Sequence, residues 1–327
     1  MSLDWSPFVE IVRNHKRFVL TTHVRPDADG LGSMLGLKDV FEGLGKTVRM
    51  AIASTWPPRY TFLDPDHRIE RYDVADQSWH DNDVTIVLDT GTWGQLGDFG
   101  AFLRTFSGKK IVIDHHISQD DLGALAMVDT TAEATGRLVY EAIEALGATL
   151  TKTVANPIFA ALATDTGWFR HNNTSPQTFA LADKLMQNGA DPTYLFNQLY
   201  EQNSLPRLKL TSIVLARLQV VENGLVAYTE VRRTDYAETG ATPQDTEDLI
   251  NYCRSLAGVE VASFFMEQPA GGVKVSFRSR SKVNVAAIAE KFGGGGHRLA
   301  SGTILHTSLE DAKQQVLAAI RTALQRE

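Results

Sequence analysis

The first half of the chain alternates short apolar runs with stretches in which apolar residues recur at helical spacing. The β-rich apolar runs lie at 17–23, 47–53, 84–91, 109–116 and 124–129. Helical spacing follows at 30–45, 132–147 and 154–167. Continuous apolar strands that alternate with helices are typical of a parallel sheet covered on both faces. We therefore predict an α/β domain with a doubly wound, mainly parallel sheet.

The pattern changes near residue 218. Helical spacing continues to about Arg217, after which two stretches have the alternation of β-hairpins, with turns at 222–224 and 269–272. We predict a smaller α+β domain there, across a cleft from the first. The predicted bounds are 1–189 for the N-terminal domain, 190–217 for a helical linker and 218–327 for the C-terminal domain.

Composition narrows the class of protein. The chain has 327 residues, 43% of them hydrophobic and 22% charged, which suits two ordinary globular domains. Its formal net charge of -7 argues against a protein that coats long nucleic acid by bulk electrostatics. The single cysteine, Cys253, excludes an intramolecular disulfide and a cysteine-based zinc site. Without an apolar run near membrane length or a signal-peptide pattern, we expect a cytoplasmic protein.

Acidic and histidine side chains gather where the predicted strands end. The stretch "HVRPDADGLGS" follows the first strand, Asp89 ends "VTIVLD", and Asp114 begins the "DHH" that ends "KKIVIDHH". Asp165 lies at the end of a predicted helix. Because the carboxyl ends of parallel strands line the ligand crevice of an open sheet, we expect these side chains to converge.

The expected donors are carboxylates and imidazoles without a thiolate, a set that suits Mn²⁺ or Mg²⁺. One ion does not need so many anionic ligands, whereas two ions that share a bridging carboxylate do. Two-metal sites clamp the attacking and leaving oxygens of an in-line displacement at phosphorus. Asp27 and Asp29 would each face a different cation, which would overcome their mutual repulsion.

Each of these signals also has an ordinary structural interpretation. Asp29 alone suits the N-cap of a helix that begins near Gly30. Asp89 alone suits a turn at a strand end. A lone pair of neighbouring histidines usually binds no metal. Their joint occurrence at the strand ends of one sheet favours the metal site.

The same residues carry a family resemblance. "HVRPDADGLGS", "VLDTG", "DHH" and "ATDTGWFRHNNTS" resemble the four motifs of the DHH phosphoesterase superfamily. "VKVSFRSRSKVNVAAIAEKFGGGGHRLASG" resembles the signature of its DHH-associated C-terminal domain. The match runs through most of the chain, and the most similar branch is that of nanoRNases and phosphoadenosine-phosphate (pAp) phosphatases. The resemblance makes 1–189 the catalytic domain and 218–327 the substrate-binding domain.

The resemblance implies two divalent metal ions, and we expect Mn²⁺. The ligands of the first ion would be His23, Asp27 and Asp89. The ligands of the second ion would be Asp29, Asp89, His115 and Asp165. Asp89 would bridge the ions, Asp114 would orient a ligand, and His116 would face the scissile phosphate. Ala28 replaces a glycine common in the family and leaves the ligands intact, whereas Trp168 could alter the entrance beside Asp165.

The C-terminal domain would bind substrate through a glycine-rich run and basic side chains. The residues implied are Arg278, Arg280, Gly294, Gly295, Gly296, His297 and Arg298. Glycines let backbone N–H groups approach a phosphate closely, and arginine suits bidentate phosphate contacts. "GGGGH" also has the composition of a flexible linker, although it lies inside the predicted domain. Arg280 also suits an ordinary solvated face.

The resemblance implies hydrolysis of short oligoribonucleotides to mononucleotides, together with removal of a 3′-phosphate from pAp. The expected partner is short RNA or a small nucleotide, not long duplex nucleic acid or a membrane. The sequence leaves open whether the chain is a monomer or a homodimer. The alternatives within the superfamily are an exopolyphosphatase or inorganic pyrophosphatase, and a phosphodiesterase of cyclic or linear dinucleotides. A non-catalytic nucleotide-binding regulator is the alternative of a different class.

Overall fold

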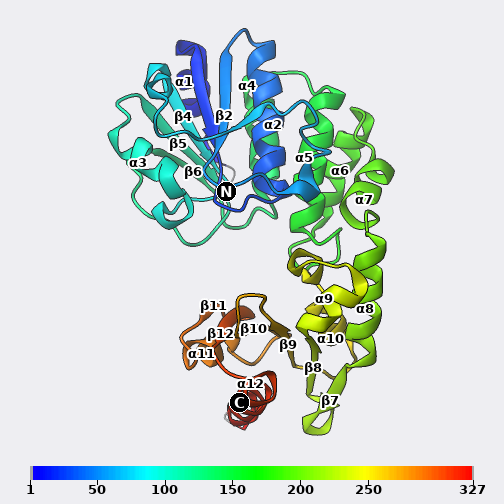
Figure 1. The fold of residues 1–327 in the computed structure, drawn as a ribbon. Helices are drawn as coiled ribbons and strands as arrows, with labels where there is room; N and C mark the ends of the chain where they lie inside the picture. Colours follow the sequence, from blue (N-terminus) through cyan, green and yellow to red (C-terminus); the bar gives the residue numbers. More distant parts are fainter. Residues whose placement is uncertain (1–2, 326–327) are drawn as a thin grey trace. The chain divides into compact units, whose positions relative to one another are not determined.

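The computed structural model describes residues 3–325, which form two compact units (Figure 1). The N-terminal unit ends at Gln202 and the C-terminal unit begins at Asn203, inside the segment predicted as a linker. The predicted outer bounds, residues 1 and 327, lie outside the described residues. Within residues 3–325, no helix combines the length and the apolar character that a membrane span requires.

The N-terminal unit is built on a six-stranded, all-parallel sheet in the order β3-β2-β1-β4-β5-β6. Its strands are β1 (Arg17–Thr21), β2 (Thr47–Ile52), β3 (Ile69–Arg71), β4 (Val84–Leu88), β5 (Lys109–Asp114) and β6 (Leu125–Val128). The strand order reverses between β1 and β4, and the doubly wound prediction is confirmed. Ligands of such sheets bind beyond the strand ends at this reversal.

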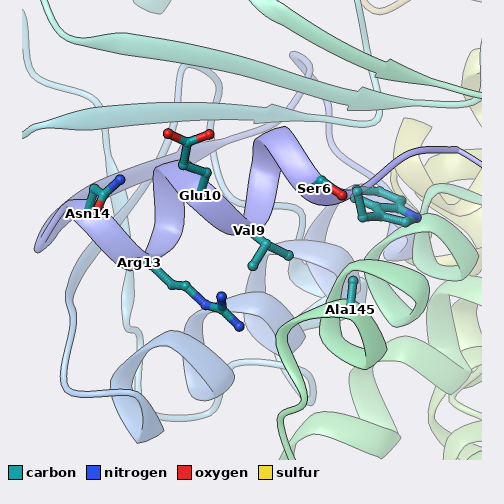
Figure 2. Close-up of a pocket in the computed structure, with 7 residues that line it drawn as sticks. Ser6, Val9, Glu10, Arg13, Asn14 and Ala145 are labelled. Atoms are coloured by element: carbon teal, nitrogen blue, oxygen red, sulfur yellow. The ribbon is translucent and has the colours of Figure 1, made fainter.

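Seven α-helices belong to the described part of the N-terminal unit. They are α1 (Ser6–Asn14), α2 (Ala28–Gly43), α3 (Gly97–Thr105), α4 (Thr135–Leu146), α5 (Lys152–Asp165), α6 (Pro176–Gln187) and α7 (Pro192–Tyr200). Short 3₁₀ turns lie between β2 and β3 at η1 (Pro58–Tyr60), between β3 and β4 at η2 (Gln77–Asp81), and between β4 and α3 at η3 (Trp93–Gln95). Beside α1 lies an open hollow of about 570 Å³ (Figure 2).

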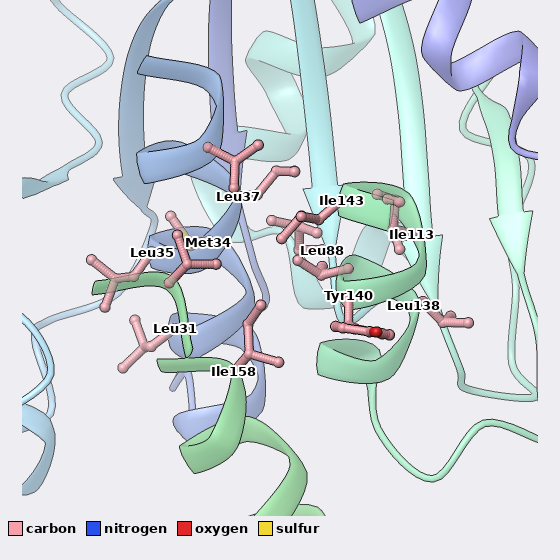
Figure 3. Packing of buried hydrophobic residues seen from close by; sticks show 14 of the residues in the cluster. Leu31, Met34, Leu35, Leu37, Leu88, Ile113, Leu138, Tyr140, Ile143 and Ile158 are labelled. Carbon is pink, nitrogen blue, oxygen red and sulfur yellow. The ribbon is translucent and has the colours of Figure 1, made fainter. Parts of the chain in front are cut away.

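Helices cover both faces of this sheet because alternate strand residues point to opposite sides. Phe18 and Leu20 of β1 pack in the larger core with α2, α4 and α5. Val19, between them, packs in a second core with Phe99 and Phe102 of α3. Figure 3 shows the larger core, where side chains of α2 and α4 meet those of β4 and β5. The two cores fix the sheet, and with it the positions of its strand ends.

The C-terminal unit has a mixed six-stranded sheet in the order β11-β12-β10-β9-β8-β7, parallel only between β8 and β9 among the described strands. Its strands are β7 (Gln219–Val221), β8 (Val226–Val231), β9 (Val261–Glu267), β10 (Val273–Ser279), β11 (Gly295–His297) and β12 (Ala300–Leu305). Its helices are α8 (Leu205–Ala216), α9 (Arg233–Thr239), α10 (Ile250–Ser255), α11 (Val285–Glu290) and α12 (Leu309–Leu324), with 3₁₀ turns η4 (Glu222–Gly224) and η5 (Pro243–Thr246). The smaller α+β class predicted for this part is confirmed.

Both predicted hairpins are present. β7 and β8 pair antiparallel around η4, and β9 and β10 pair antiparallel on either side of 268–272. The run "GGGGH" is no linker, because Gly295–His297 form β11 and pair with β12. The sequence pattern did not predict every element: in the N-terminal unit it missed β3, which has 3 residues, and α3, which has 9 and contains two glycines. In the C-terminal unit it did not place α12, which has 16 residues.

Candidate metal centre and active site

The strand ends of the N-terminal sheet bring the predicted ligands together. Three overlapping groups have donor atoms within 4.8 Å of one another. The groups are His23, Asp27 and Asp89; Asp29, His115 and Asp165; and Asp89, His115 and His116. All six residues predicted as metal ligands therefore lie in one cluster, with Asp89 in two of its groups.

The two oxygens of Asp89 face different histidines. Oδ2 lies 3.4 Å from Nε2 of His23, which also lies 3.8 Å from Oδ1 of Asp27. Oδ1 lies 3.6 Å from Nε2 of His115. The same His115 nitrogen lies 3.5 Å from Oδ2 of Asp165 and 3.8 Å from Oδ2 of Asp29. This is the arrangement that a carboxylate shared by two cations needs.

Asp27 starts α2 as its N-cap. Its Oδ1 accepts hydrogen bonds from the backbone N–H groups of Asp29, at 2.9 Å, and Gly30, at 3.2 Å. The helix therefore begins at Ala28, and the capping role that suited Asp29 in the sequence belongs to Asp27. Because Asp27 accepts the capping hydrogen bonds, the Asp29 carboxylate does not, and it can face the cluster.

Helix α4 holds two of the carboxylates through residues that the sequence did not single out. The backbone N–H of Thr135 donates to Oδ2 of Asp29 at 2.7 Å, and that of Gly136 donates to Oδ1 at 2.8 Å. The Thr135 hydroxyl donates to Oδ1 of Asp89 at 2.9 Å. A helix N-terminus favours an anion there. In the sequence these two residues stand only as "TG" near the start of the helical pattern at 132–147, and nothing there indicates the contact.

The backbone at Asp89 is left-handed, with φ of 63°. A non-glycine residue in this region costs on the order of 1 kcal/mol, so the surrounding structure must enforce it. The Asp89 N–H is fixed on the Ile113 carbonyl of the neighbouring strand at 3.0 Å. Strand β4 ends at Leu88, so this left-handed residue stands directly after the strand, where the two histidines face its carboxylate.

The cluster carries an excess of buried negative charge. Asp29 and Asp89 are only 1% and 2% exposed. Burial and then the charges of Asp89, Asp165 and Asp27 raise the pKa of Asp29 well above its ordinary value. Burial raises the pKa of Asp165 to about 6, with His115 opposing. Burial would lower the pKa of His23, but Asp27 and Asp89 outweigh it and raise the pKa to about 10.

A hydrogen-bonded chain orients His116 at the edge of the cluster. The Asp114 Oδ1 accepts from Nδ1 of His116 at 2.8 Å and from the backbone N–H of His115 at 2.8 Å. Gln119 donates to the other Asp114 oxygen at 2.6 Å. Asp114 thus contacts the ring of His116, whereas the ring of His115 contacts the Ala132 carbonyl. The Asp114 carboxylate raises the pKa of His116, whose side chain is 54% exposed.

Gln119 is a third residue that the sequence did not single out. A side chain at Gly91 would place a Cβ 1.7 Å from the Gln119 amide oxygen, so the glycine of "DTG" makes room for it. The two segments also pair at Gly91 and Gln119 in an isolated parallel bridge. The "DTG" motif therefore supplies Asp89, and its glycine leaves space for the Gln119 amide that donates to Asp114.

The predicted substrate residues lie in and around β10 and β11 of the C-terminal unit. Arg278 donates to the Phe277 carbonyl at 3.1 Å, and burial lowers its pKa, with Asp248 opposing. Arg280 donates to the carbonyls of Arg254 and Leu256 at the end of α10. The arginines are therefore anchored on backbone oxygens.

The packing of the chain requires glycine in the run Gly294–Gly296, in addition to the ligand binding predicted for it. A Cβ at Gly294 would lie 2.2 Å from the Gly302 carbonyl oxygen, and Gly296 has φ of 138°. Gly295 and His297 are exposed on β11. The close pairing of β11 with β12 thus depends on two of the three predicted glycines.

The hollow beside α1 is a separate feature. Its lining residues are Trp5, Ser6, Val9, Glu10, Arg13, Asn14 and Ala145 (Figure 2). None of the predicted site residues is among them, so the candidate site is the cluster at the strand ends.

Comparison with known proteins gives the family. A model described as the DHH family, N-terminal domain, matches residues 17–164, and one described as the DHHA1 domain matches 222–326. The Bacillus subtilis (strain 168) protein named bifunctional oligoribonuclease and PAP phosphatase NrnA is 30% identical over 320 residues, which cover 96% of this chain and 97% of that protein. The chain belongs to the DHH phosphoesterase family. The resemblance seen in the sequence motifs is confirmed.

Solved structures share the fold of this DHH phosphoesterase. An exopolyphosphatase-related protein from Bacteroides fragilis matches with a TM-score of 0.90 and 24% identity, over 97% of this chain and 95% of that chain. An exonuclease RecJ, solved bound to manganese, matches with a TM-score of 0.55 and 16% identity, over 97% of this chain and 94% of that chain. Both show that the arrangement of strands and helices recurs.

The donor set of this DHH phosphoesterase fits divalent metal ions. The donors are carboxylate oxygens and imidazole nitrogens, without sulfur, and the buried carboxylates carry more charge than the neighbouring histidines offset. Burying such a group without a counter-charge is costly, and a divalent cation removes the cost. The cluster therefore has the composition and the charge of a site for hard or borderline cations.

Proposed function

We propose that this DHH phosphoesterase uses two divalent metal ions to hydrolyse short oligoribonucleotides to mononucleotides, and that the preferred metal is Mn²⁺. We also propose that it removes the 3′-phosphate of pAp. The observation that carries the proposal is the carboxylate of Asp89, whose two oxygens face the two histidines His23 and His115. The substrates are supported by the name of the Bacillus subtilis relative, which spans nearly the whole chain.

The proposed ligands follow the groups in the cluster. His23, Asp27 and Asp89 would hold one ion, and Asp29, Asp89, His115 and Asp165 would hold the other. Bound ions supply Lewis acidity that stabilises negative charge on the phosphoryl oxygens in the transition state. Helix α4 keeps the carboxylates of Asp29 and Asp89 in place through Thr135 and Gly136.

His116 is the residue proposed to face the scissile phosphate. Its Nδ1 is tied to Asp114, so its Nε2 remains for a substrate oxygen. The raised pKa of His116 favours the protonated ring, which donates from Nε2 to an anionic oxygen. The chain of Gln119, Asp114 and His116 thus orients a proton donor before substrate binds.

The basic residues of the C-terminal unit are proposed to bind the nucleotide. Arg278 and Arg298 supply positive charge for a substrate phosphate, and His297 supplies a ring nitrogen for a hydrogen bond to it. Gly294–Gly296 let backbone N–H groups approach the phosphate closely. A chain of net charge -7 has little general attraction for long nucleic acid, which supports a short substrate.

The test is a comparison of hydrolysis rates on four substrates with Mn²⁺: a dinucleotide, a five-nucleotide RNA, pAp and inorganic pyrophosphate. The proposal predicts rapid release of mononucleotides from both RNAs, loss of phosphate from pAp and little pyrophosphate hydrolysis. Fast hydrolysis of pyrophosphate with none of RNA or pAp would contradict it. Inactivity on all four by fully metal-loaded protein would favour the nucleotide-binding regulator instead.

A further inference from the structure

Glu260 organises a basic loop of the C-terminal unit. Glu260 directly precedes β9, and the loop at 280–284 joins β10 to α11. Its Oε1 accepts from the backbone N–H groups of Ser281 at 3.2 Å, Lys282 at 2.6 Å and Val283 at 3.1 Å. The hydroxyls of Ser279 and Ser281 donate to the same carboxylate at 3.0 and 3.3 Å.

This carboxylate is ionised where it lies. Burial raises its pKa, but the N–H groups of Lys282, Val283 and Ser281 and the Ser279 hydroxyl outweigh it, and the net effect lowers the pKa. Hydrogen bonds to a charged acceptor are about twice as strong as neutral ones. Because three successive N–H groups converge on one charge, the loop has a fixed course rather than a set of alternatives.

The fixed loop in turn places basic side chains proposed to bind substrate. The Lys282 carbonyl accepts from Nη2 of Arg298 at 2.8 Å, and the Arg298 carbonyl accepts from the Val285 N–H at 2.8 Å. The Arg280 N–H donates to the Glu260 carbonyl at 2.8 Å. Glu260 therefore holds the backbone of Lys282, and Lys282 holds the guanidinium of Arg298.

We propose that Glu260 is a positioning residue for nucleotide binding, which acts through the loop at 280–284 on Arg298. The proposal rests on the proposed function, since Arg298 is assigned to substrate there. The negative charge of Glu260 does not oppose an anionic substrate, because five donors surround its carboxylate. Its removal frees the loop and lets the Arg298 guanidinium move away from the phosphate.

The test compares full-length Glu260→Ala and Glu260→Gln with the wild type, loaded with Mn²⁺. For a dinucleotide, Glu260→Ala should raise KM about tenfold with kcat within about twofold, as expected when an organised charge-assisted contact is lost. Glu260→Gln should raise KM less, because its amide oxygen still accepts the loop N–H groups. A small generic phosphodiester, which needs the metals alone, should be hydrolysed at the wild-type rate.

Glu222→Gln is the matched control. It removes another carboxylate of the same unit, which pairs with Arg321 at 2.7 Å, and it should leave the dinucleotide KM unchanged. Thermal unfolding verifies that each variant is folded. Unchanged KM in folded Glu260→Ala, or equal losses on both substrates, would overturn the proposal. If Glu260→Ala does not fold, a KM for Glu260→Gln equal to that of Glu222→Gln would overturn it.

Binding of adenosine monophosphate by titration calorimetry separates this proposal from the proposed function. A wild-type chain that hydrolyses no dinucleotide contradicts the function. The dissociation constants of wild type and Glu260→Ala still differ about tenfold if Glu260 positions the nucleotide site. Equal dissociation constants would overturn the role of Glu260 alone.

Discussion

The two ends of the N-terminal sheet treat aspartate in opposite ways. At the amino end, Asp83 precedes β4 and accepts from the Arg17 guanidinium at 2.9 Å and from the N–H groups of Arg17 and Lys16. The Arg17 hydrogen bond is the main reason that the pKa of Asp83 falls to about 2. At the carboxyl end, burial and neighbouring carboxylates raise the pKa values of Asp29 and Asp89.

The two ends of the sheet differ in the positive group that faces their carboxylates. Asp83 has an arginine of its own chain and ties the starts of β1 and β4 together. Across residues 3–325, the side chains that form ion pairs with Asp29, Asp89 and Asp165 are histidines. At the amino end of the sheet the carboxylate stabilises the fold. At the carboxyl end the clustered carboxylates destabilise it, and a bound cation can offset that loss.

The largest expected effect is at the carboxyl end. Asp89→Ala should abolish activity and metal binding, because it removes the carboxylate proposed to be shared. His116→Ala should lower kcat by roughly a hundred- to a thousandfold while metal content stays near that of the wild type, as for loss of a positioned proton donor. Elemental analysis beside steady-state kinetics checks both. The reverse pattern, with metal lost in His116→Ala and kept in Asp89→Ala, would refute these assignments.

Asp165→Asn should have opposite effects with and without metal. The pKa of Asp165 is raised to about 6, above its ordinary 3.8, so its charge destabilises the metal-free fold above pH 6 and not below about pH 4. In metal-free protein at pH 7.5, the variant should be more stable by about 1–2 kcal/mol, after allowance for partial exposure. Urea unfolding at pH 7.5 and pH 4 measures the difference.

With saturating Mn²⁺ the stability difference should reverse, so that Asp165→Asn is less stable than the wild type. The reason is that metal binding adds more to the free energy of unfolding of the wild type than to that of the variant. A variant that is less stable than the wild type in metal-free protein at pH 7.5 would show that Asp165 is not under repulsion there.

The smallest expected effect is at the amino end. The pKa of Asp83 is lowered to about 2, so its contribution to stability is present above about pH 4 and is lost as the pH falls through 2. Asp83→Asn should therefore cost about 1 kcal/mol at pH 7, because solvent screens an ion pair near the surface. Urea unfolding should give the same cost with and without Mn²⁺. A cost that depends on Mn²⁺ would remove the contrast between the two ends.

The sequence predicted the ligand cluster because its signals are local. Each predicted ligand except Asp165, which ends a helix, follows an apolar strand pattern, and parallel strands bring their ends to one edge. The hydrogen bonds that hold the cluster are not local: Thr135 lies 106 positions from Asp29 and 46 from Asp89. No periodicity or spacing encodes such a contact, so Thr135 and Gly136 were not predicted.

The same reason explains what was missed elsewhere. The resemblance implied that Asp114 orients a metal ligand. Its contact with the ring of His116 and the contact from Gln119 depend on how the chain turns after β5, which the sequence does not show. Glu260 lies in an ordinary strand pattern, 22 positions from Lys282, and its role appears only where the loop folds onto it. Sequence reasoning finds groups that lie at strand ends and misses groups that hold them.

The most direct test of the account is the number of Mn²⁺ ions bound per chain. Metal-free protein is titrated with Mn²⁺, and bound metal is measured by elemental analysis after gel filtration, for the wild type and Asp89→Ala. We expect two ions per wild-type chain and the loss of both sites in folded Asp89→Ala, because the two proposed sites share that carboxylate. Retention of two ions by Asp89→Ala, or a wild-type chain that binds none, would contradict it.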